Sequence, residues 1–295
     1  MDIKKIMVVG SGFMGSGISQ VAAAAGFTVI MQDITDELVQ KGLATIETNL
    51  KNSVAKGKLS ENDKNAILGR ITPTLDLSLA KDCDIVIEVI FESKQAKAEL
   101  YKKLEEICPP RVIFASNTSS IPITELAAYT KRPEKFAGMH FFSPAPVMKL
   151  VEVIMGLKTS AETAATIKDL AEKFGKIPVY VKDGPGFLVN RINFALRNES
   201  FRCLAEGVAT IEDIDKALKF GLNHPMGVFE LIDFVGLDIA LAGVETLWEY
   251  YKDPRWAPSL ILKKMVSSGD LGRKSGKGWY DYTSGEKKSR TDLNF

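Results

Sequence analysis

The residues most suited to chemistry are three glycines whose spacing fits phosphate binding. Gly10, Gly12 and Gly15 form a G-x-G-x-x-G motif between an apolar run at residues 6 to 9 and a small-residue helical pattern at residues 18 to 25. The first glycine allows a tight turn, the second lets the backbone approach a pyrophosphate, and the third lets the helix pack on the strand. The motif therefore predicts a dinucleotide site. Two residues between these glycines are expected to line it as well: Phe13 and Met14.

An acidic residue follows where a ribose-binding side chain is expected. The next apolar run, residues 27 to 31, ends just before Asp33. A carboxylate there can accept hydrogen bonds from the adenosine ribose hydroxyls. A glycine turn with a solvated aspartate is the alternative, but strand, glycines, helix, strand and acid in this order favour the dinucleotide site. Because no arginine stands within residues 31 to 35 to bind a 2′-phosphate, the expected cofactor is NAD.

One of the two histidines could move protons in a redox reaction. His140 lies near the end of a predicted strand, residues 136 to 142, at the edge of an α/β sheet where ligands bind. Imidazole titrates near neutral pH, so it can take the proton of an alcohol and return it. Glu152 is embedded in the apolar run at residues 148 to 154, where an unpaired carboxylate is costly. We expect it to pair with His140, orient the ring and stabilise the imidazolium.

The same residue pattern also fits a structural interpretation of both side chains. His140 could be a hydrogen-bonded core histidine and Glu152 a charged residue of an edge strand. The pattern alone does not decide between the two. His224 precedes a proline in a predicted turn, and we expect it to be structural.

Other polar residues could bind a substrate. Residues 116 to 122 follow a predicted strand, so their hydroxyl and amide groups lie at its carboxyl end, although Ser and Thr before a proline are also ordinary turn and cap residues. Asn190 starts a predicted helix, where it could reach across a cleft or be solvated. Three lysines could anchor the phosphates of a large anionic substrate or form a solvated helix surface: Lys51, Lys56 and Lys58.

Alternating strands and helices in the first half of the chain would position these residues. This alternation is typical of a parallel sheet with helices on both faces. A polar helical stretch from residue 35 to about residue 70, interrupted at residues 56 to 58, predicts a two-helix excursion from the sheet. The later strands are predicted at residues 84 to 90, 112 to 115, 136 to 142, 149 to 154 and 177 to 181.

The pattern changes at Gly184-Pro185-Gly186, which can continue neither a strand nor a helix. Beyond it, residues 187 to 282 show helical periodicity without a convincing strand. The predicted fold is α/β, with a Rossmann-type doubly wound sheet and a helical excursion, followed by a smaller all-helical domain. The expected division is a nucleotide-binding domain at residues 1–183 and a helical substrate and dimerisation domain at residues 184–295.

Composition narrows the classes of partner. The 38 Lys and Arg nearly balance the 37 Asp and Glu, so the net charge of +1 gives no general attraction to nucleic acid or to an anionic membrane. Three scattered cysteines without a C-x-x-C spacing indicate reduced thiols and argue against a metal site. Since the longest nearly apolar stretch, residues 21 to 31, is too short to cross a bilayer, we expect a soluble cytoplasmic protein.

Together these residues resemble the L-3-hydroxyacyl-CoA dehydrogenase family, and most of all its bacterial short-chain 3-hydroxybutyryl-CoA members. The likeness runs from residue 3 to about residue 282, and the segment at 138 to 154 is its most specific part. The matching segments are VVGSGFMGSGI at 8 to 18, SNTSS at 116 to 120, GMHFFSPAPVMKLVEVI at 138 to 154, DGPGFLVNRI at 183 to 192, HPMGVFELIDFVGLD at 224 to 238 and GRKSGKGWYDY at 272 to 282.

The resemblance implies a role for each matching residue. His140 corresponds to the catalytic base and Glu152 to its carboxylate partner. Ser119 and Asn190 resemble the two groups that bind the 3-oxygen of the substrate. Asp33 matches the ribose-binding acid. The resemblance thus favours the catalytic interpretation of the His140 and Glu152 pair.

Further contacts are implied for the cofactor and for coenzyme A. Glu92 and Lys97 match cofactor-contacting positions, and Asn117 is expected to contact the cofactor too. Ser53 and Lys56 look like coenzyme A contacts. One departure is Ser143, where many family members have Asn, and it concerns hydrogen bonding near His140.

The activity implied is NAD-dependent, reversible oxidation of (3S)-3-hydroxybutyryl-CoA to acetoacetyl-CoA by a homodimer. One alternative is a dehydrogenase for a longer or carboxylated 3-hydroxyacyl-CoA, such as 3-hydroxyadipyl-CoA. The other is an inactive nucleotide-binding protein, as lens lambda-crystallin resembles this family. Retention of both His140 and Glu152 argues against loss of activity.

Overall fold

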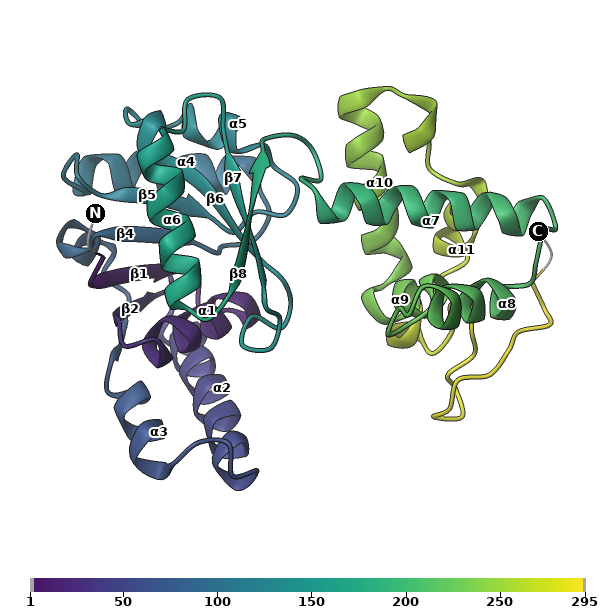
Figure 1. Cartoon of the computed structure of the whole chain (residues 1–295), viewed down its shortest axis with the longest axis horizontal. Coiled ribbons are helices and arrows are strands. Elements are labelled where there is room, and N and C mark those ends of the chain that lie inside the picture. The colour runs from purple at the N-terminus through teal and green to yellow at the C-terminus, as the bar shows by residue number, and fades with distance from the viewer. Residues whose placement is uncertain (1–2, 294–295) are drawn as a thin grey trace. The chain divides into compact units, whose positions relative to one another are not determined.

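The computed structural model describes residues 3–293, and the chain folds as two units, Met1–Phe187 and Leu188–Phe295. Figure 1 shows the sheet and its helices in the first unit and a set of helices in the second. The predicted α/β fold with a Rossmann-type sheet followed by a helical unit is confirmed. The division after Asp183 stays a prediction of where an independent domain ends.

The first unit is built on an eight-stranded sheet in the order β3-β2-β1-β4-β5-β6-β7-β8. Neighbouring strands are parallel except β6 and β7, which are antiparallel. The direction of chain progress reverses between β1 and β4, and ligands of such sheets bind at the carboxyl ends beside that point. The strands are β1 (Lys5–Val9), β2 (Thr28–Gln32), β3 (Ile71–Thr74), β4 (Ile85–Glu88), β5 (Ile113–Ser116), β6 (Phe136–Phe141), β7 (Leu150–Met155) and β8 (Ile177–Lys182).

Strand β3 is not among the strands predicted from the sequence. It is a short edge strand, ITPT, whose proline and two threonines give no apolar alternation to detect. Proline is tolerated there because an edge strand leaves one side of its backbone unpaired.

Helices cover both faces of the sheet. The interruption predicted at residues 56 to 58 separates α2 from α3, and Figure 1 shows this pair extending beyond the sheet. The helices are α1 (Phe13–Ala24), α2 (Asp36–Ala55), α3 (Glu61–Leu68), α4 (Lys94–Ile107), α5 (Ile123–Ala127) and α6 (Ala161–Lys173), with short 3-10 turns η1 (Leu77–Asp82) and η2 (Pro133–Lys135).

Two hydrophobic cores lie on the two faces of the sheet. Ile6 and Val8 of β1 belong to the core under α1, α2 and α6, whereas Met7 and Val9 belong to the core under α4 and α5. This division follows from the two-residue period of a strand, which sends successive side chains to opposite faces. Since both faces are covered, the central strands β1, β4 and β5 are mostly apolar.

The second unit is helical, and residues 188–293 add only isolated β-bridges around residues 272 to 288. Its core includes the aromatic rings of Phe201, Phe229 and Trp279, which contact one another edge-to-face or at a tilt. The sequence did not separate α9 from its neighbours. The elements are α7 (Val189–Ala205), α8 (Ile211–Lys216), the π-helix η3 (Ala217–Gly221), α9 (Val228–Val235), α10 (Leu237–Tyr251), η4 (Pro254–Trp256), α11 (Leu260–Ser267) and η5 (Arg273–Ser275).

Candidate active site

The structure pairs His140 with Glu152 across two neighbouring strands. Antiparallel pairing of β6 and β7 places the two residues opposite each other, and His140 Nδ1 lies 2.7 Å from Glu152 Oε2. Glu152 is fully buried and His140 is 5% exposed. A carboxylate on Nδ1 fixes the ring orientation and leaves Nε2 for a ligand. Within residues 3–293, no protein group is hydrogen-bonded to Nε2.

Two aromatic side chains pack against the imidazole ring of His140. The ring centroids of Phe142 and Phe187 lie 4.7 Å and 5.7 Å from that of His140. Phe187 is buried and has a φ of 49°, in the left-handed region that costs a non-glycine residue about 1–3 kcal/mol. Its strained backbone is retained in the turn that begins at Gly184, where it places the ring against His140.

The turn that follows His140 is stabilised by hydrogen bonds from a buried lysine. Lys176 donates from Nζ to the carbonyl oxygens of Ala145 and Met148, at 2.6 Å and 2.8 Å. Burial lowers the pKa of Lys176. The turn also packs closely on α1, because a Cβ at Gly17 would lie 3.1 Å from Pro146 Cδ. The backbone between β6 and β7 is therefore fixed at residues 145 to 148.

The three glycines of the first turn meet different constraints. Gly10 has a φ of +103°, and a Cβ there would lie 2.6 Å from the carbonyl oxygen of Val89. A Cβ at Gly15 would collide with Gly10 itself. At Gly12 a Cβ would meet open space, so this part of the loop is free for a ligand to approach. These constraints are those expected for a turn that receives a pyrophosphate.

Asp33 lies beside this turn. Its Oδ2 accepts hydrogen bonds from the backbone N–H and the hydroxyl of Ser11, both at 2.7 Å. Phe13 is 65% exposed at the start of α1, and Met14 is half-buried. The structure thus brings the glycine turn and the acid of the predicted dinucleotide site together.

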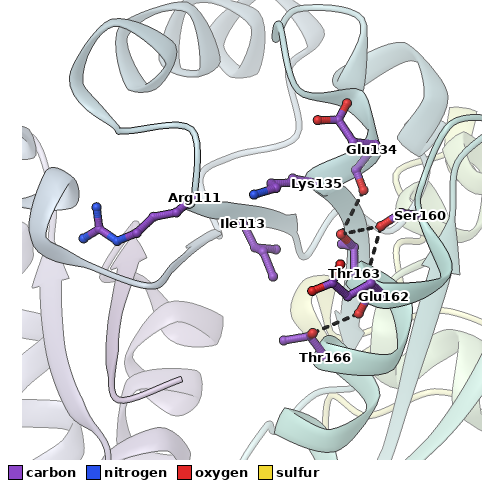
Figure 2. A pocket seen from close by; sticks show the side chains of 8 residues that line it. All are labelled: Arg111, Ile113, Glu134, Lys135, Ser160, Glu162, Thr163 and Thr166. Atoms are coloured by element: carbon purple, nitrogen blue, oxygen red, sulfur yellow. Dashed lines mark hydrogen bonds between the residues drawn. The ribbon is translucent and has the colours of Figure 1, made fainter. Parts of the chain in front are cut away.

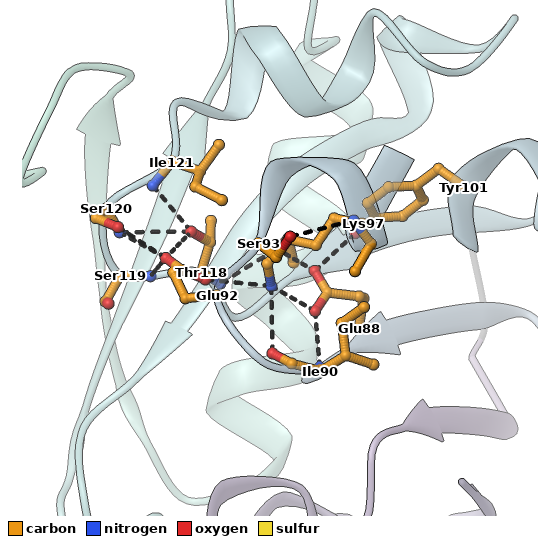
Figure 3. Close-up of polar contacts among 12 residues, drawn as sticks. Glu88, Ile90, Glu92, Ser93, Lys97, Tyr101, Thr118, Ser119, Ser120 and Ile121 are labelled. Atoms are coloured by element: carbon orange, nitrogen blue, oxygen red, sulfur yellow. Dashed lines mark hydrogen bonds and ion pairs between the residues drawn. The ribbon is translucent and has the colours of Figure 1, made fainter. Parts of the chain in front are cut away.

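The loop after β5 contains one hydroxyl that is free for a ligand. Ser116 donates to Glu88, whereas Thr118 and Ser120 donate to Glu92. Ser119 is exposed, and its hydroxyl has no hydrogen-bond partner among residues 3–293 (Figure 3). Of the hydroxyls in this loop, that of Ser119 is therefore the one available to a substrate.

This loop is joined to the strand that carries the histidine. The backbone N–H of Phe141, next to His140, donates to Asn117 Oδ1 at 2.8 Å. The N–H of Asn117 in turn donates to the carbonyl of Glu88 at 2.9 Å. Asn117 therefore fixes the loop against the ends of both β4 and β6.

Lys97 and Glu92, matched to cofactor positions, lie in a buried ionic cluster (Figure 3). Lys97 Nζ is 2.5 Å from Glu88 Oε1 and 3.3 Å from Glu92 Oε2, and its side chain is 1% exposed. The Glu92 side chain is 34% exposed. Sequence reasoning missed Glu88, although it is an acid in an apolar strand, the same signal that drew attention to Glu152.

The remaining candidates are separate from these groups. Ser53 lies near the end of α2, where its hydroxyl bonds the carbonyl of Asn49, and the exposed Lys56 caps the same helix. Asn190 is the second residue of α7 in the other unit, so its approach to His140 stays a prediction. His224 follows the π-helix η3, and its N–H bonds the carbonyl of Leu218.

A cavity of about 170 Å³ lies at the end of the sheet opposite His140, where the parallel strands β5 and β6 begin (Figure 2). Ile113, the first residue of β5, and Lys135, just before β6, line it, so it opens at the amino ends of these strands. Ser160 and Thr163 there bond each other at the start of α6. The cavity is not part of the site around His140.

Residues 3–293 show neither a metal-binding cluster nor a membrane-spanning helix. No cluster of three or more His, Cys, Asp or Glu side chains in this range is placed to hold a metal ion. No helix in the same range combines the length and apolar character needed to cross a membrane. All three cysteines are free thiols, and burial raises the pKa of Cys83 to about 11 and that of Cys108 to about 12.

Comparison with known proteins covers nearly the whole chain. Residues 5–184 match the 3-hydroxyacyl-CoA dehydrogenase, NAD binding domain, and residues 186–282 match the 3-hydroxyacyl-CoA dehydrogenase, C-terminal domain. A probable 3-hydroxybutyryl-CoA dehydrogenase of Bacillus subtilis is 50% identical over 282 residues, which cover 96% of this chain and 98% of the relative.

Two other relatives extend this likeness. The crystal structure of (S)-3-hydroxybutyryl-CoA dehydrogenase from Ralstonia eutropha matches with a TM-score of 0.93 and 46% identity, covering 95% of this chain and 99% of that one. A 3-hydroxyadipyl-CoA dehydrogenase of Escherichia coli is 41% identical over 283 residues, which cover 96% of this chain and 60% of the relative.

Proposed function

The chain belongs to the 3-hydroxyacyl-CoA dehydrogenase family, and on this premise we propose that it interconverts (3S)-3-hydroxybutyryl-CoA and acetoacetyl-CoA with NAD. The short-chain substrate is supported by the names of relatives that match nearly end to end. The observation that carries the chemistry is the buried pair of His140 and Glu152, 2.7 Å apart, at the ligand-binding edge of the sheet.

In the proposed mechanism, His140 moves the proton. The cofactor held at the glycine turn would supply the redox chemistry at C3: its reduced form, NADH, would donate a hydride to the ketone, and its oxidised form, NAD+, would accept one from the alcohol. His140 gives its proton to the 3-oxygen during reduction and takes it back during oxidation, through Nε2, because Nδ1 is engaged by Glu152. The carboxylate stabilises the imidazolium. Ser119 and Asn190 bind the 3-oxygen and align it for both transfers.

The residues around the glycine turn fit a dinucleotide. Gly12 faces open space, and the Asp33 carboxylate lies at the same turn, where we assign it to the adenosine ribose. A carboxylate there repels a 2′-phosphate, so kcat/KM should be higher with NADH than with NADPH. A preference for NADPH would refute the role of Asp33. Four residues are assigned as further cofactor contacts: Phe13, Met14, Glu92 and Asn117.

The direct test is a reduction assay with purified protein and 3-ketoacyl-CoA substrates of increasing length. Acetoacetyl-CoA with NADH should give the highest kcat/KM. A higher value with a longer or dicarboxylic thioester would move the assignment to another substrate of the same family, as the Escherichia coli relative illustrates. Absence of turnover with every thioester would overturn the enzymatic proposal.

We assign Ser53 and Lys56, near the end of α2, to the nucleotide part of coenzyme A. Remote binding energy of this kind can hold the 3-oxygen in line with His140, so free acetoacetate should be a much poorer substrate. Lys56→Ala should lower kcat/KM for the thioester and reduce its salt dependence, while leaving NADH binding unchanged. Lys41→Ala, on an exposed position of the same helix, is the control. Unchanged kcat/KM in Lys56→Ala would refute only the assignment of Lys56 to coenzyme A, not the proposed reaction.

We further propose that the second unit forms a homodimer of a cytoplasmic enzyme. Several large apolar side chains of this unit are exposed, and burying them against a second copy of the chain would be favourable. They include Ile192, Val208, Phe220, Leu222, Phe234 and Leu260, each more than half exposed. Light scattering should give twice the mass of the chain, and a monomer at micromolar concentration would contradict the assignment.

A further inference from the structure

Three charged side chains meet beneath the loop that carries Ser119. Glu88 at the end of β4 is fully buried, and Lys97 of α4 is 1% exposed. Lys97 Nζ lies between Glu88 Oε1 at 2.5 Å and Glu92 Oε2 at 3.3 Å (Figure 3). Buried charges are costly unless paired, so the ammonium group of Lys97 helps to stabilise the two neighbouring carboxylates, together with hydrogen bonds to Glu88 from Tyr101 and Ser116.

Glu92 joins this cluster to the loop. Its Oε1 accepts the backbone N–H groups of Ser119 and Ser120, at 3.0 Å and 3.1 Å, and the hydroxyls of Thr118 and Ser120, at 2.5 Å and 2.9 Å. Four donors to one carboxylate oxygen define where residues 118 to 120 lie. Because the hydroxyl of Ser119 is the one left without a protein partner, the cluster determines where that hydroxyl is presented.

The charge of Lys97 sustains this arrangement. Burial alone would raise the pKa of Glu92, but Lys97 and the hydrogen bonds from Thr118 and Ser120 outweigh burial and lower it. Without the ammonium group, the buried carboxylate of Glu88 and the partly exposed carboxylate of Glu92 would repel each other, so Glu92 would take up a proton or turn away from Glu88. Either change would weaken the hydrogen bonds that Glu92 accepts from residues 118 to 120.

We propose that Lys97 is a positioning residue that acts through Glu92 to place the Ser119 hydroxyl against the substrate oxygen. This inference rests on the proposed function for its kinetic test. It differs from the matched role of Lys97 as a direct cofactor contact, because the Lys97 side chain is 1% exposed and its Nζ is enclosed by oxygens of Glu88, Glu92 and Ile90.

The test is Lys97→Met, compared with Lys103→Met on the exposed side of the same helix. For Lys97→Met we expect kcat with acetoacetyl-CoA to fall about tenfold or more, the scale of a misplaced substrate contact. The Kd for NADH, measured by its own fluorescence, should change little. Lys103→Met should match wild type. A raised Kd for NADH with unchanged kcat would show a direct cofactor contact and overturn the proposal.

A double-mutant cycle separates positioning from general damage. If Lys97 acts through Glu92, the variant with both Lys97→Met and Glu92→Gln should lose no more turnover than Glu92→Gln alone. Multiplicative losses would mean that the two residues act independently, which contradicts the proposal.

Two further measurements cover failure of the first variant and failure of the proposed function. If Lys97→Met does not fold, Thr118→Val removes a single donor to Glu92, and unchanged kcat in that variant and in Glu92→Gln would overturn the inference. If wild type does not reduce acetoacetyl-CoA, the proposed function fails by itself. Hydrogen exchange at the amides of Ser119 and Ser120 still tests the cluster, since it should accelerate in Lys97→Met and stay slow in Lys103→Met.

Discussion

Glu152 and Asp233 are both buried acids in apolar segments, yet they face different kinds of partner. Glu152 of β7 is fully buried and lies 2.7 Å from the imidazole of His140. Asp233 of α9 is 1% exposed and accepts the backbone N–H groups of Trp279 and Tyr280, at 2.8 Å and 2.9 Å. The first acid faces a group that can gain and lose a proton, whereas the second faces amides that cannot.

The difference shows that a buried acid indicates a functional site only when the group it contacts can take part in the chemistry. Asp233 joins α9 to the segment near the end of the chain, where a Cβ at Gly278 would collide with its carboxylate. Burial raises the pKa of Asp233 to about 6, although the hydrogen bonds from Trp279 and Tyr280 act to lower it. We therefore assign Glu152 to catalysis and Asp233 to the stability of the helical unit.

The largest expected effect is on turnover when the imidazole is removed. His140→Gln deletes the proton donor without touching the glycine turn, so kcat should fall roughly 10²-fold or more, the usual contribution of general acid–base catalysis. NADH affinity should barely change. His224→Gln, which alters the histidine of the helical unit, is the control and should keep normal turnover. Near-normal turnover in His140→Gln would mean that the partner of Glu152 is not catalytic, and Glu152 would then be a structural acid like Asp233.

A smaller loss is expected when the acid beside the imidazole is neutralised. Glu152→Gln keeps an oxygen facing Nδ1 but removes the charge that stabilises the imidazolium, so kcat should fall roughly 10- to 100-fold, less than for His140→Gln. Unfolding should not become easier, because a buried charge is removed. An equal kcat with a lower melting temperature would make Glu152 a structural acid like Asp233.

Asp233→Ala should give the opposite result. It leaves the N–H groups of Trp279 and Tyr280 without their acceptor, which should lower the free energy of unfolding by about 2 kcal/mol at pH 7. Turnover per folded molecule should stay close to wild type. Urea denaturation followed by tryptophan fluorescence is selective, because all three tryptophans lie in the helical unit: Trp248, Trp256 and Trp279. A loss of kcat at unchanged stability would contradict this assignment.

The sequence indicated much of the fold but distinguished these acids only in part. The order of strands, glycines and helices predicted the sheet, because each element carries its own local pattern. Glu152, Glu88 and Asp233 give the same local signal, an acid among apolar residues. Which partner each one meets depends on the antiparallel placement of β7 or on contacts between distant segments, such as Asp233 with Trp279. Pairing of Glu152 was inferred because histidine is scarce, whereas lysines and backbone amides are too common to single out a partner.

The smallest expected effect is the pH dependence of the helical unit. Because the pKa of Asp233 is raised to about 6 when folded, the folded chain holds a proton that the unfolded chain releases above about pH 4. Its contribution to stability is therefore fully present at about pH 4 and is lost as the pH rises through about 6. Between pH 5 and pH 7 the free energy of unfolding should fall by about 1 kcal/mol from this group.

Other groups also titrate in this range, so the informative quantity is the difference between wild type and Asp233→Ala at each pH. Removing the acid removes its titration, and the variant should therefore be more destabilised at pH 5 than at pH 7, by the same amount of about 1 kcal/mol. A difference that is constant from pH 5 to pH 7 would mean that Asp233 stays ionised in the folded chain. In that case the hydrogen bonds from Trp279 and Tyr280 would outweigh the effect of burial on the pKa of Asp233. Asp233 and Glu152 would then differ only in the group that each of them contacts.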